Sequence, residues 1–141
     1  MERKASAVWQ GGLKEGRGTV STASKVLNDT QYSFTSRFEE GTGTNPEELV
    51  AAAHAGCFSM ALSAILGEAD LVPETIATTA TVTFQPVDGA PTLTSIHLEV
   101  EARVPQGTEA AFTEAAEKAK ADCPISRVLN TKITMSAKLV S

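Results

Sequence analysis

The chain of 141 residues suits one domain with a sizeable core, and we expect a single domain over residues 1–141. Charged residues make up 21% and hydrophobic residues 42%, which is typical of a globular protein rather than a disordered one. The formal net charge is −5, the basic residues are scattered, and there is one Trp and one Tyr, so we expect no nucleic-acid partner. The opening Met-Glu-Arg-Lys is followed by no apolar run, which argues against a signal peptide and predicts a cytoplasmic protein. In that compartment paired cysteines are more often catalytic or metal-binding than structural.

The first part of the chain shows strand patterns separated by turn residues. Residues 4–10 alternate and predict a strand, a glycine-rich turn follows, and residues 19–27 predict a second strand. In residues 31–38 aromatic and polar side chains alternate, which indicates another extended segment with Arg37 on its polar face.

The longest apolar stretch, residues 44–67, opens with a helix start signal. Asn45 is a suitable N-cap, Pro46 suits the first helical position, and Glu48 completes a capping-box pattern. Residues 49–67 include no acidic residue, lysine or arginine. Because a helix that is apolar all round is buried on every side, we expect this helix to be fully buried.

A membrane span is the alternative for this helix, since its length is close to what a bilayer requires. However, the stretch is rich in alanine, contains His54 and two glycines, and lacks flanking basic or aromatic anchors. Small residues let another helix backbone approach closely. The favoured interpretation is therefore a central helix in a protein core, or one packed against its copy in a dimer, with no membrane partner.

The rest of the chain alternates strands with helices. Residues 75–84 and 92–104 predict two strands joined by a hairpin connection, residues 108–122 predict a helix, and residues 132–140 predict a last strand. The second of these strands should turn five apolar residues to one side: Ile96, Leu98, Val100, Ala102 and Val104. The expected fold class is α+β.

Two cysteines are candidates for thiol chemistry, because a helix N-terminus lowers the pKa of a thiol. Cys123 precedes Pro124, which can start a short helix there. That helix should turn three apolar residues inward: Ile125, Val128 and Leu129. Cys57 directly follows Gly56, so it begins a helical segment only if the long helix breaks at that point. In an unbroken helix it is a mid-helix core thiol and should be inert.

Two other interpretations of the cysteines, as buried core residues or as metal ligands, stay open. Either one alone fits a small buried hydrophobe, and the absence of a CxxC motif argues against a thioredoxin-type site or a zinc knuckle. A metal site would combine Cys57, Cys123, His54 and His97, although this spacing matches no established metal motif. His54 is more readily a satisfied core histidine, and His97 is expected to be exposed on the polar face of its strand.

Three charged residues could assist a thiolate. Glu48 is explained by the capping box, whereas Glu47 is only partly explained by its place in the first helical turn and is freer for another role. Arg37 is a cation that could stabilise a thiolate, and Arg17 in a glycine-flanked turn is a second candidate.

Three segments together resemble the osmotically inducible protein C and organic hydroperoxide resistance family. They are TNPEEL at residues 44–49, AAHAGCFSMAL at residues 52–62 and CPIS at residues 123–126. The resemblance runs nearly end to end and is closest to the osmotically inducible protein C branch. It implies an OsmC-like fold, in which antiparallel sheets from both chains of an intertwined homodimer enclose long central helices. It also implies a thiol-dependent peroxidase that reduces organic hydroperoxides in stress defence.

The resemblance assigns roles to individual residues. Cys57 would be the peroxidatic cysteine, Cys123 the resolving cysteine, Glu47 the family's glutamate and Arg37 the arginine of this branch, with Arg17 as the fallback. The hypothesis is that Cys57 becomes a sulfenic acid, that Cys123 condenses with it to a disulfide, and that an external dithiol restores both thiols. No cofactor is needed, and the family suggests a reductant such as a lipoyl group.

The hypothesis makes a geometric demand on the long helix. A straight helix puts Glu47 and Cys57 about 15 Å apart, which is too far for one shared arginine. Either the helix breaks near residues 54–56, or a dimer partner contributes part of the site. A greasy pocket for bulky hydroperoxides is expected around Phe58, Met60 and Phe38. The alternative without turnover is a stress protein that binds a small apolar ligand and keeps both cysteines in its core.

Overall fold

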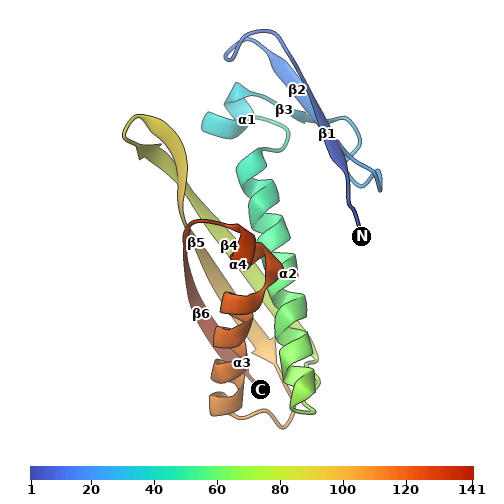
Figure 1. The fold of residues 1–141 in the computed structure, drawn as a ribbon, viewed down its shortest axis with the longest axis vertical. Helices are drawn as coiled ribbons and strands as arrows, with labels where there is room; N and C mark the ends of the chain where they lie inside the picture. The colour runs from blue at the N-terminus through green and yellow to red at the C-terminus, as the bar shows by residue number, and fades with distance from the viewer. The chain divides into compact units, whose positions relative to one another are not determined.

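The computed structural model describes residues 1–141 (Figure 1). The chain divides into two compact units, Met1–Leu49 and Val50–Ser141, and the first unit contains a small antiparallel sheet. The three strands of this sheet lie in the order β1-β2-β3. They are β1 (Ala5–Gln10), β2 (Arg17–Thr22) and β3 (Thr30–Tyr32). The strand expected over residues 19–27 ends at Thr22, because the Thr22 hydroxyl accepts a hydrogen bond from the Leu27 N–H and closes a turn.

A one-turn helix, α1 (Phe34–Phe38), replaces the second part of the extended segment expected over residues 31–38. Ser33 caps this helix: its hydroxyl accepts from the Ser36 N–H at 3.2 Å, and the Ser36 hydroxyl accepts from the Ser33 N–H at 2.8 Å. This reciprocal capping box satisfies two helix donors that an extended chain would leave to solvent. The expectation of strand was wrong here because local side-chain bonds outweighed the alternation of polar and apolar residues.

The second unit holds a mixed three-stranded sheet in the order β4-β5-β6. Its strands are β4 (Thr75–Val87), β5 (Ala90–Arg103) and β6 (Lys132–Val140). The tight turn between β4 and β5 has positive φ at Asp88 and Gly89, which is typical of a two-residue hairpin. The antiparallel pairing implied by the family resemblance holds for the other strand pairs, whereas β6 pairs parallel to β5. A helical connection separates these two strands, and only a crossover of that kind can join parallel neighbours.

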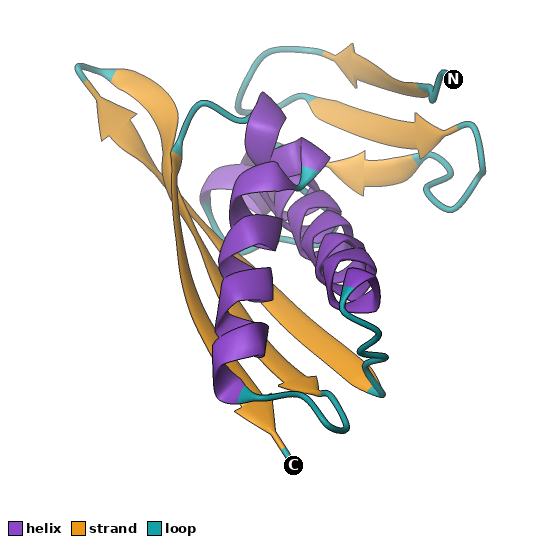
Figure 2. Ribbon diagram, turned by 60° about the horizontal axis from the view of Figure 1, so that its bottom comes forward, coloured by secondary structure: helices purple, strands orange, loops and turns teal.

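Helices α2 (Pro46–Glu68) and α3 (Glu109–Asp122) pack on the same face of this sheet (Figure 2). The short helix α4 (Pro124–Val128) follows α3 directly. The five inward residues expected over residues 92–104 are all buried, as predicted, although β5 ends at Arg103, one residue before the last of them. They meet the other members of one core, namely Phe58, Leu62, Leu66, Phe112, Ala115, Ala116, Ala119 and Cys123.

The two faces of α2 differ sharply in burial. Asn45 caps the helix as expected, with its Oδ1 accepting from the Glu48 N–H at 2.7 Å. The other half of the expected capping box differs, because the Glu48 carboxylate accepts from the Thr44 hydroxyl. Only four residues of the helix are fully buried: His54, Phe58, Leu62 and Leu66. The expectation of burial on every side is therefore wrong for a single chain. The exposed residues include Ala53, Gly56, Met60, Ala64 and Gly67. By length and composition alone α2 could also cross a membrane.

Candidate functional site

Cys57 lies in the middle of α2, which runs unbroken through Gly56. The break expected near residues 54–56 is therefore absent, and Cys57 does not begin a helical segment. A single glycine costs a helix only about 1 kcal/mol relative to alanine, which is too little to interrupt a helix anchored by three large core side chains. Cys57 is partly buried and packs against the core.

Cys123 faces Cys57 from the junction between α3 and α4. It is the C-cap of α3 and the N-cap of α4, with Pro124 in the first turn of the short helix, as the Cys-Pro pair predicted. Its side chain is completely buried. The two Sγ atoms are 2.8 Å apart, and both cysteines are free thiols. Residues that are far apart in sequence thus form a thiol pair.

The environment raises the pKa of the Cys57 thiol. Burial is the largest cause, followed by the hydrogen bond to Cys123; the backbone N–H of Ile125 donates to the Cys57 sulfur and acts in the opposite direction. The Ile125 N–H belongs to the first turn of α4. The thiolate-stabilising helix terminus expected from Cys123-Pro124 is thus present and acts on Cys57, but within the chain it is outweighed by burial.

A second polar pair joins the same two helices one turn away. His54 is completely buried, and its Nε2 lies 2.7 Å from the Ser126 hydroxyl. Burial lowers the pKa of His54, so the ring is neutral near pH 7. His54 lies in the core, as predicted, whereas Ser126 was not among the predicted site residues. Val128 was expected to face inward, but it is 73% exposed and Ser126 only 9%. The available signal was the matched spacing, since His54 precedes Cys57 by three residues and Ser126 follows Cys123 by three.

Arg37 and Glu47 form an ion pair within the first unit. The Arg37 Nε donates to the Glu47 Oε1 at 2.9 Å, and the Glu47 side chain is only 13% exposed. The Arg37 guanidinium also lies over the Phe38 ring, 5.2 Å from its centroid. Glu47 was the carboxylate left without a full structural explanation by the sequence, and this contact supplies one.

The pair is held by hydrogen bonds between α1 and the loop that leads into α2. The Ser36 hydroxyl donates to the Thr44 carbonyl at 2.8 Å, and the Asn45 amide donates to the Ser36 carbonyl at 3.0 Å. Ser36 and Thr44 are both buried. These bonds fix Arg37 of α1 beside the first turn of α2, where Glu47 lies.

An aromatic hollow of about 250 Å³ lies beside Arg37 in the first unit. Its lining consists of Trp9, Leu13, Tyr32, Ser33, Phe34, Arg37 and Phe38. Of the three residues expected around a greasy pocket, Phe38 belongs to this hollow. Phe58 is a core residue, and Met60 is 78% exposed. Periodicity along the chain could not separate pocket lining from core.

The remaining candidates do not join these pairs. Arg17 is exposed at the start of β2. His97 is half-buried rather than exposed, because its two ring nitrogens contact the hydroxyls of Thr134 and Ser136. The structure contains no group of three or more His, Cys, Asp and Glu side chains that could hold a metal ion. The metal site considered from the sequence is therefore not assembled.

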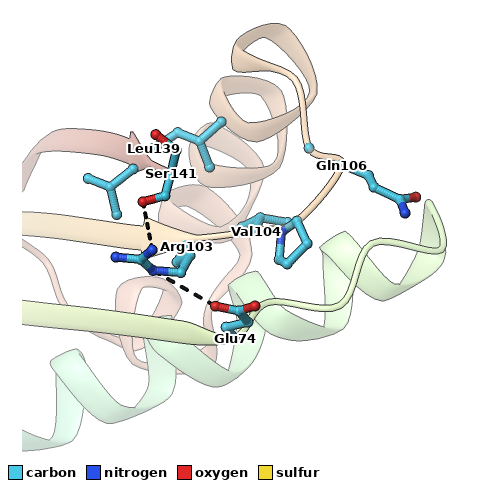
Figure 3. Close-up of a pocket in the computed structure, with 9 residues that line it drawn as sticks. Glu74, Arg103, Val104, Gln106, Leu139 and Ser141 are labelled. Carbon is cyan, nitrogen blue, oxygen red and sulfur yellow. Dashed lines mark hydrogen bonds and ion pairs between the residues drawn. The ribbon is translucent and has the colours of Figure 1, made fainter.

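A surface hollow at the end of the β4–β6 sheet also lies apart from the thiols. There Arg103 donates to the Ser141 carbonyl and pairs with Glu74 at 3.8 Å (Figure 3). The hollow includes Gly107, just before α3, whereas Cys123 follows the other end of that helix. About 20 Å of helix separates them.

A long helix on a mixed sheet, with a free thiol meeting a second thiol at a helix N-terminus, defines the class: an α+β protein with a paired-thiol site. A family model described as OsmC-like protein matches residues 39–138. The chain belongs to this family, and the resemblance drawn from the three sequence motifs is confirmed.

Individual relatives resemble this protein along nearly the whole chain. The chain is 50% identical over 141 residues to peroxiredoxin OsmC of Escherichia coli, covering 100% of this chain and 99% of that protein. An OsmC-like protein of unknown function from Vibrio cholerae superimposes with a TM-score of 0.79 at 15% identity, covering 97% of this chain and 99% of that one. The organic hydroperoxide resistance protein OhrB of Bacillus subtilis gives a TM-score of 0.68 at 22% identity, covering 97% and 98%.

Proposed function

We propose that this protein is a two-cysteine thiol peroxidase that reduces organic hydroperoxides to alcohols in defence against oxidative and osmotic stress. The observation that carries the proposal is the 2.8 Å contact between Cys57 and Cys123. A disulfide needs the two sulfur atoms at about 2.05 Å, so a small movement suffices to join them. The 50% identity to a peroxiredoxin over the full chain supports the same chemistry.

The reaction has three balanced steps. The Cys57 thiolate attacks the terminal oxygen of ROOH, the O–O bond breaks, and RO⁻ takes a proton to leave as ROH, while Cys57 becomes a sulfenic acid. The Cys123 thiol then attacks the Cys57 sulfur; the S–O bond breaks, a disulfide forms, and water leaves. An external dithiol reduces this disulfide, returns both thiols and is itself oxidised to a disulfide. A lipoyl group would serve as that dithiol.

The first step needs a thiolate, and the chain alone raises the pKa of Cys57. Arg37 is the proposed cation, held by Glu47 and polarising the O–O bond. Because α2 is unbroken, about 15 Å of helix separates Glu47 from Cys57. We therefore assign the Arg37–Glu47 pair that serves each Cys57 to the second copy of a homodimer. The aromatic hollow beside Arg37 would then receive the organic group of the substrate.

The exposed face of α2 supports this dimer. It is apolar and rich in alanine and glycine, which allow two helix backbones to approach closely. Met60 stands on this face with 78% of its surface exposed. Met60→Arg should shift the protein to monomers in analytical ultracentrifugation, because it places a charge in the apolar contact. The matched control is Val72→Arg, at a residue 77% exposed in the loop after α2, and it should leave the dimer intact.

Intact-mass measurement tests the chemistry directly. Reduced protein treated with one equivalent of an alkyl hydroperoxide should lose two hydrogens and both free thiols. Unchanged mass with two free thiols would overturn the peroxidase proposal. That result would favour the second candidate, a binding protein with core cysteines, for which the raised pKa of Cys57 is the supporting observation.

Mixing two inactive variants tests the shared site. Cys57→Ser removes the nucleophile and Arg37→Met removes the cation, so each pure dimer should be inactive. In a mixed dimer, the intact Cys57 of one copy would meet the intact Arg37 of the other. Random exchange should therefore restore about a quarter of wild-type activity, since half of the dimers are mixed and each has one complete site. No recovery in proven mixed dimers would mean that Arg37 does not serve the other copy.

A further inference from the structure

Two polar contacts join α2 to α4 at matched positions. Cys57 meets Cys123 at 2.8 Å, and one turn away His54 meets Ser126 at 2.7 Å. The sulfur pair carries the proposed chemistry, whereas the proposed reaction gives His54 and Ser126 no role, although both lie in segments that carry the family resemblance. It is the remaining buried titratable group in the core of this unit.

The His54 ring is confined by its surroundings. Its side chain is completely buried, Nε2 is bonded to the Ser126 hydroxyl, and Nδ1 has no hydrogen-bond partner. A neutral ring carries one proton, and a buried N–H without an acceptor is rarely tolerated. We therefore assign the proton to Nε2, from which it is donated to Ser126. His54 is then a rigid hydrogen-bond donor anchored in α2.

Helix α4 is held by this bond together with the packing of Ile125 and Leu129 against the core. It is five residues long and too short to be stable by itself, and its outward residue Val128 makes little contact with the core. Ser126 is its most buried residue, at 9% exposed. Cys123 and the Ile125 N–H, which both contact Cys57, belong to the same turn.

We propose that His54 and Ser126 are positioning residues that hold α4 against α2 and so keep Cys123 within reach of oxidised Cys57. The inference rests on the proposed two-cysteine reaction. Peroxide attack involves only Cys57, but the second step requires the Cys123 sulfur to displace the hydroxyl of the Cys57 sulfenic acid, forming the disulfide and releasing water. Loosening α4 therefore slows resolution specifically and leaves the sulfenic acid open to a second peroxide, which converts it to sulfinic acid with release of another alcohol.

Single-turnover kinetics separate the two steps. In a Cys123→Ser background, trapping of the sulfenic acid measures peroxide attack alone. With both cysteines present, loss of two hydrogens measures resolution. Ser126→Ala should slow resolution about tenfold, as expected for losing one buried hydrogen bond, and should leave attack within about twofold of the reference. His54→Leu should do the same, and sulfinic acid at Cys57 should accumulate at lower peroxide doses in both.

Conservative variants control for damage to the fold. His54→Gln retains a donor near the Nε2 position, and Ser126→Thr retains the hydroxyl, so both should recover most of the resolution rate. Resolution at the wild-type rate in Ser126→Ala would overturn this inference while the peroxidase proposal stands. An equal loss in both steps, without recovery in the conservative variants, would make the pair merely structural. If the wild-type protein itself forms no disulfide, the proposed function and this inference fall together.

Discussion

Arg37 and Glu47 form a charged pair in residues 1–49, whereas Cys57 and Cys123 form an uncharged pair in residues 50–141. The first pair is partly open, with the Arg37 side chain 36% exposed beside an aromatic hollow. The second is packed into a core, where burial raises the pKa of Cys57. Residues 1–49 therefore hold the proposed cation but no cysteine, whereas in residues 50–141 no cation is among the groups that shift the pKa of Cys57.

The contrast shows why a buried thiol does not become reactive by burial alone. Desolvation favours the neutral thiol, and within the chain only the Ile125 N–H favours the thiolate. A guanidinium brought to Cys57 would reverse this balance. In the proposed homodimer, Arg37 of the second copy supplies this guanidinium.

The largest expected effect comes from removing either thiol. Cys57→Ser should lower turnover by at least about a thousandfold, because it removes the nucleophile. Cys123→Ser is the matched control: it should abolish disulfide formation but preserve one round of peroxide consumption per chain. Stopped-flow peroxide consumption with and without a dithiol distinguishes them. A full burst of peroxide consumption in Cys57→Ser would show that Cys57 is not the sulfur that attacks the peroxide.

Replacing the charged pair should have the next largest effect. Arg37→Met should lower kcat/KM about a hundredfold, because the thiolate and the breaking O–O bond lose a charge-assisted contact. Its rate should rise about tenfold per pH unit above pH 7, since the raised thiol pKa then governs the thiolate fraction, whereas the wild-type rate should level off at lower pH. The kcat/KM of Glu47→Gln should fall between those of wild type and Arg37→Met. Parallel pH–rate profiles for wild type and Arg37→Met would show whether Arg37 lowers the pKa of the Cys57 thiol.

The buried His54 of the second unit should make the stability of the fold depend on pH. The pKa of His54 is lowered in the folded protein, so the unfolded chain binds a proton that the folded chain does not. Stability should therefore be fully present above the unfolded value of about 6.5 and fall as the pH drops below it, by at most about 1.4 kcal/mol per pH unit. Urea unfolding between pH 7.5 and about 5 measures this slope. His54→Gln should flatten it; an unchanged slope would assign it to other groups.

The smallest expected effect concerns the exposed face of α2. Nothing lies within 4 Å of a methyl group added at Gly56 or Gly67. In the monomer, alanine at either position should raise the free energy of unfolding by up to about 1 kcal/mol through helix propensity. At Gly56, nearer the helix middle, it should also weaken the dimer, measured by dilution. Unweakened association in Gly56→Ala would place the contact between copies elsewhere.

Local patterns predicted the elements with strong periodicity. The alternation that ends at Val104 has one face that only a core can accept, and its burial is as predicted. The α1 segment failed because its alternation was weaker than the Ser33–Ser36 capping box. The Val128 expectation failed because apolarity alone does not say which side of a one-turn helix meets α2.

The sequence predicted only some of the residues of the candidate site. The family resemblance named both cysteines, Arg37 and Glu47 as candidates, and the structure pairs the cysteines with each other and Arg37 with Glu47. The Cys123-Pro124 junction indicated a helix start. The role of Ser126 could not be inferred although it lies in the CPIS segment, because its contact with His54 forms only when α4 lies against α2.

By itself, then, the sequence determined the α+β class, the family, and which side chains can do thiol chemistry, because these follow from residue types and short-range spacing. Tertiary structure alone decided that α2 continues through Gly56, that β6 is parallel to β5, and that Cys57 meets Cys123. It also decided that the pKa of Cys57 is raised rather than lowered. Each of these depends on groups distant in the chain, since burial and contact are properties of packing.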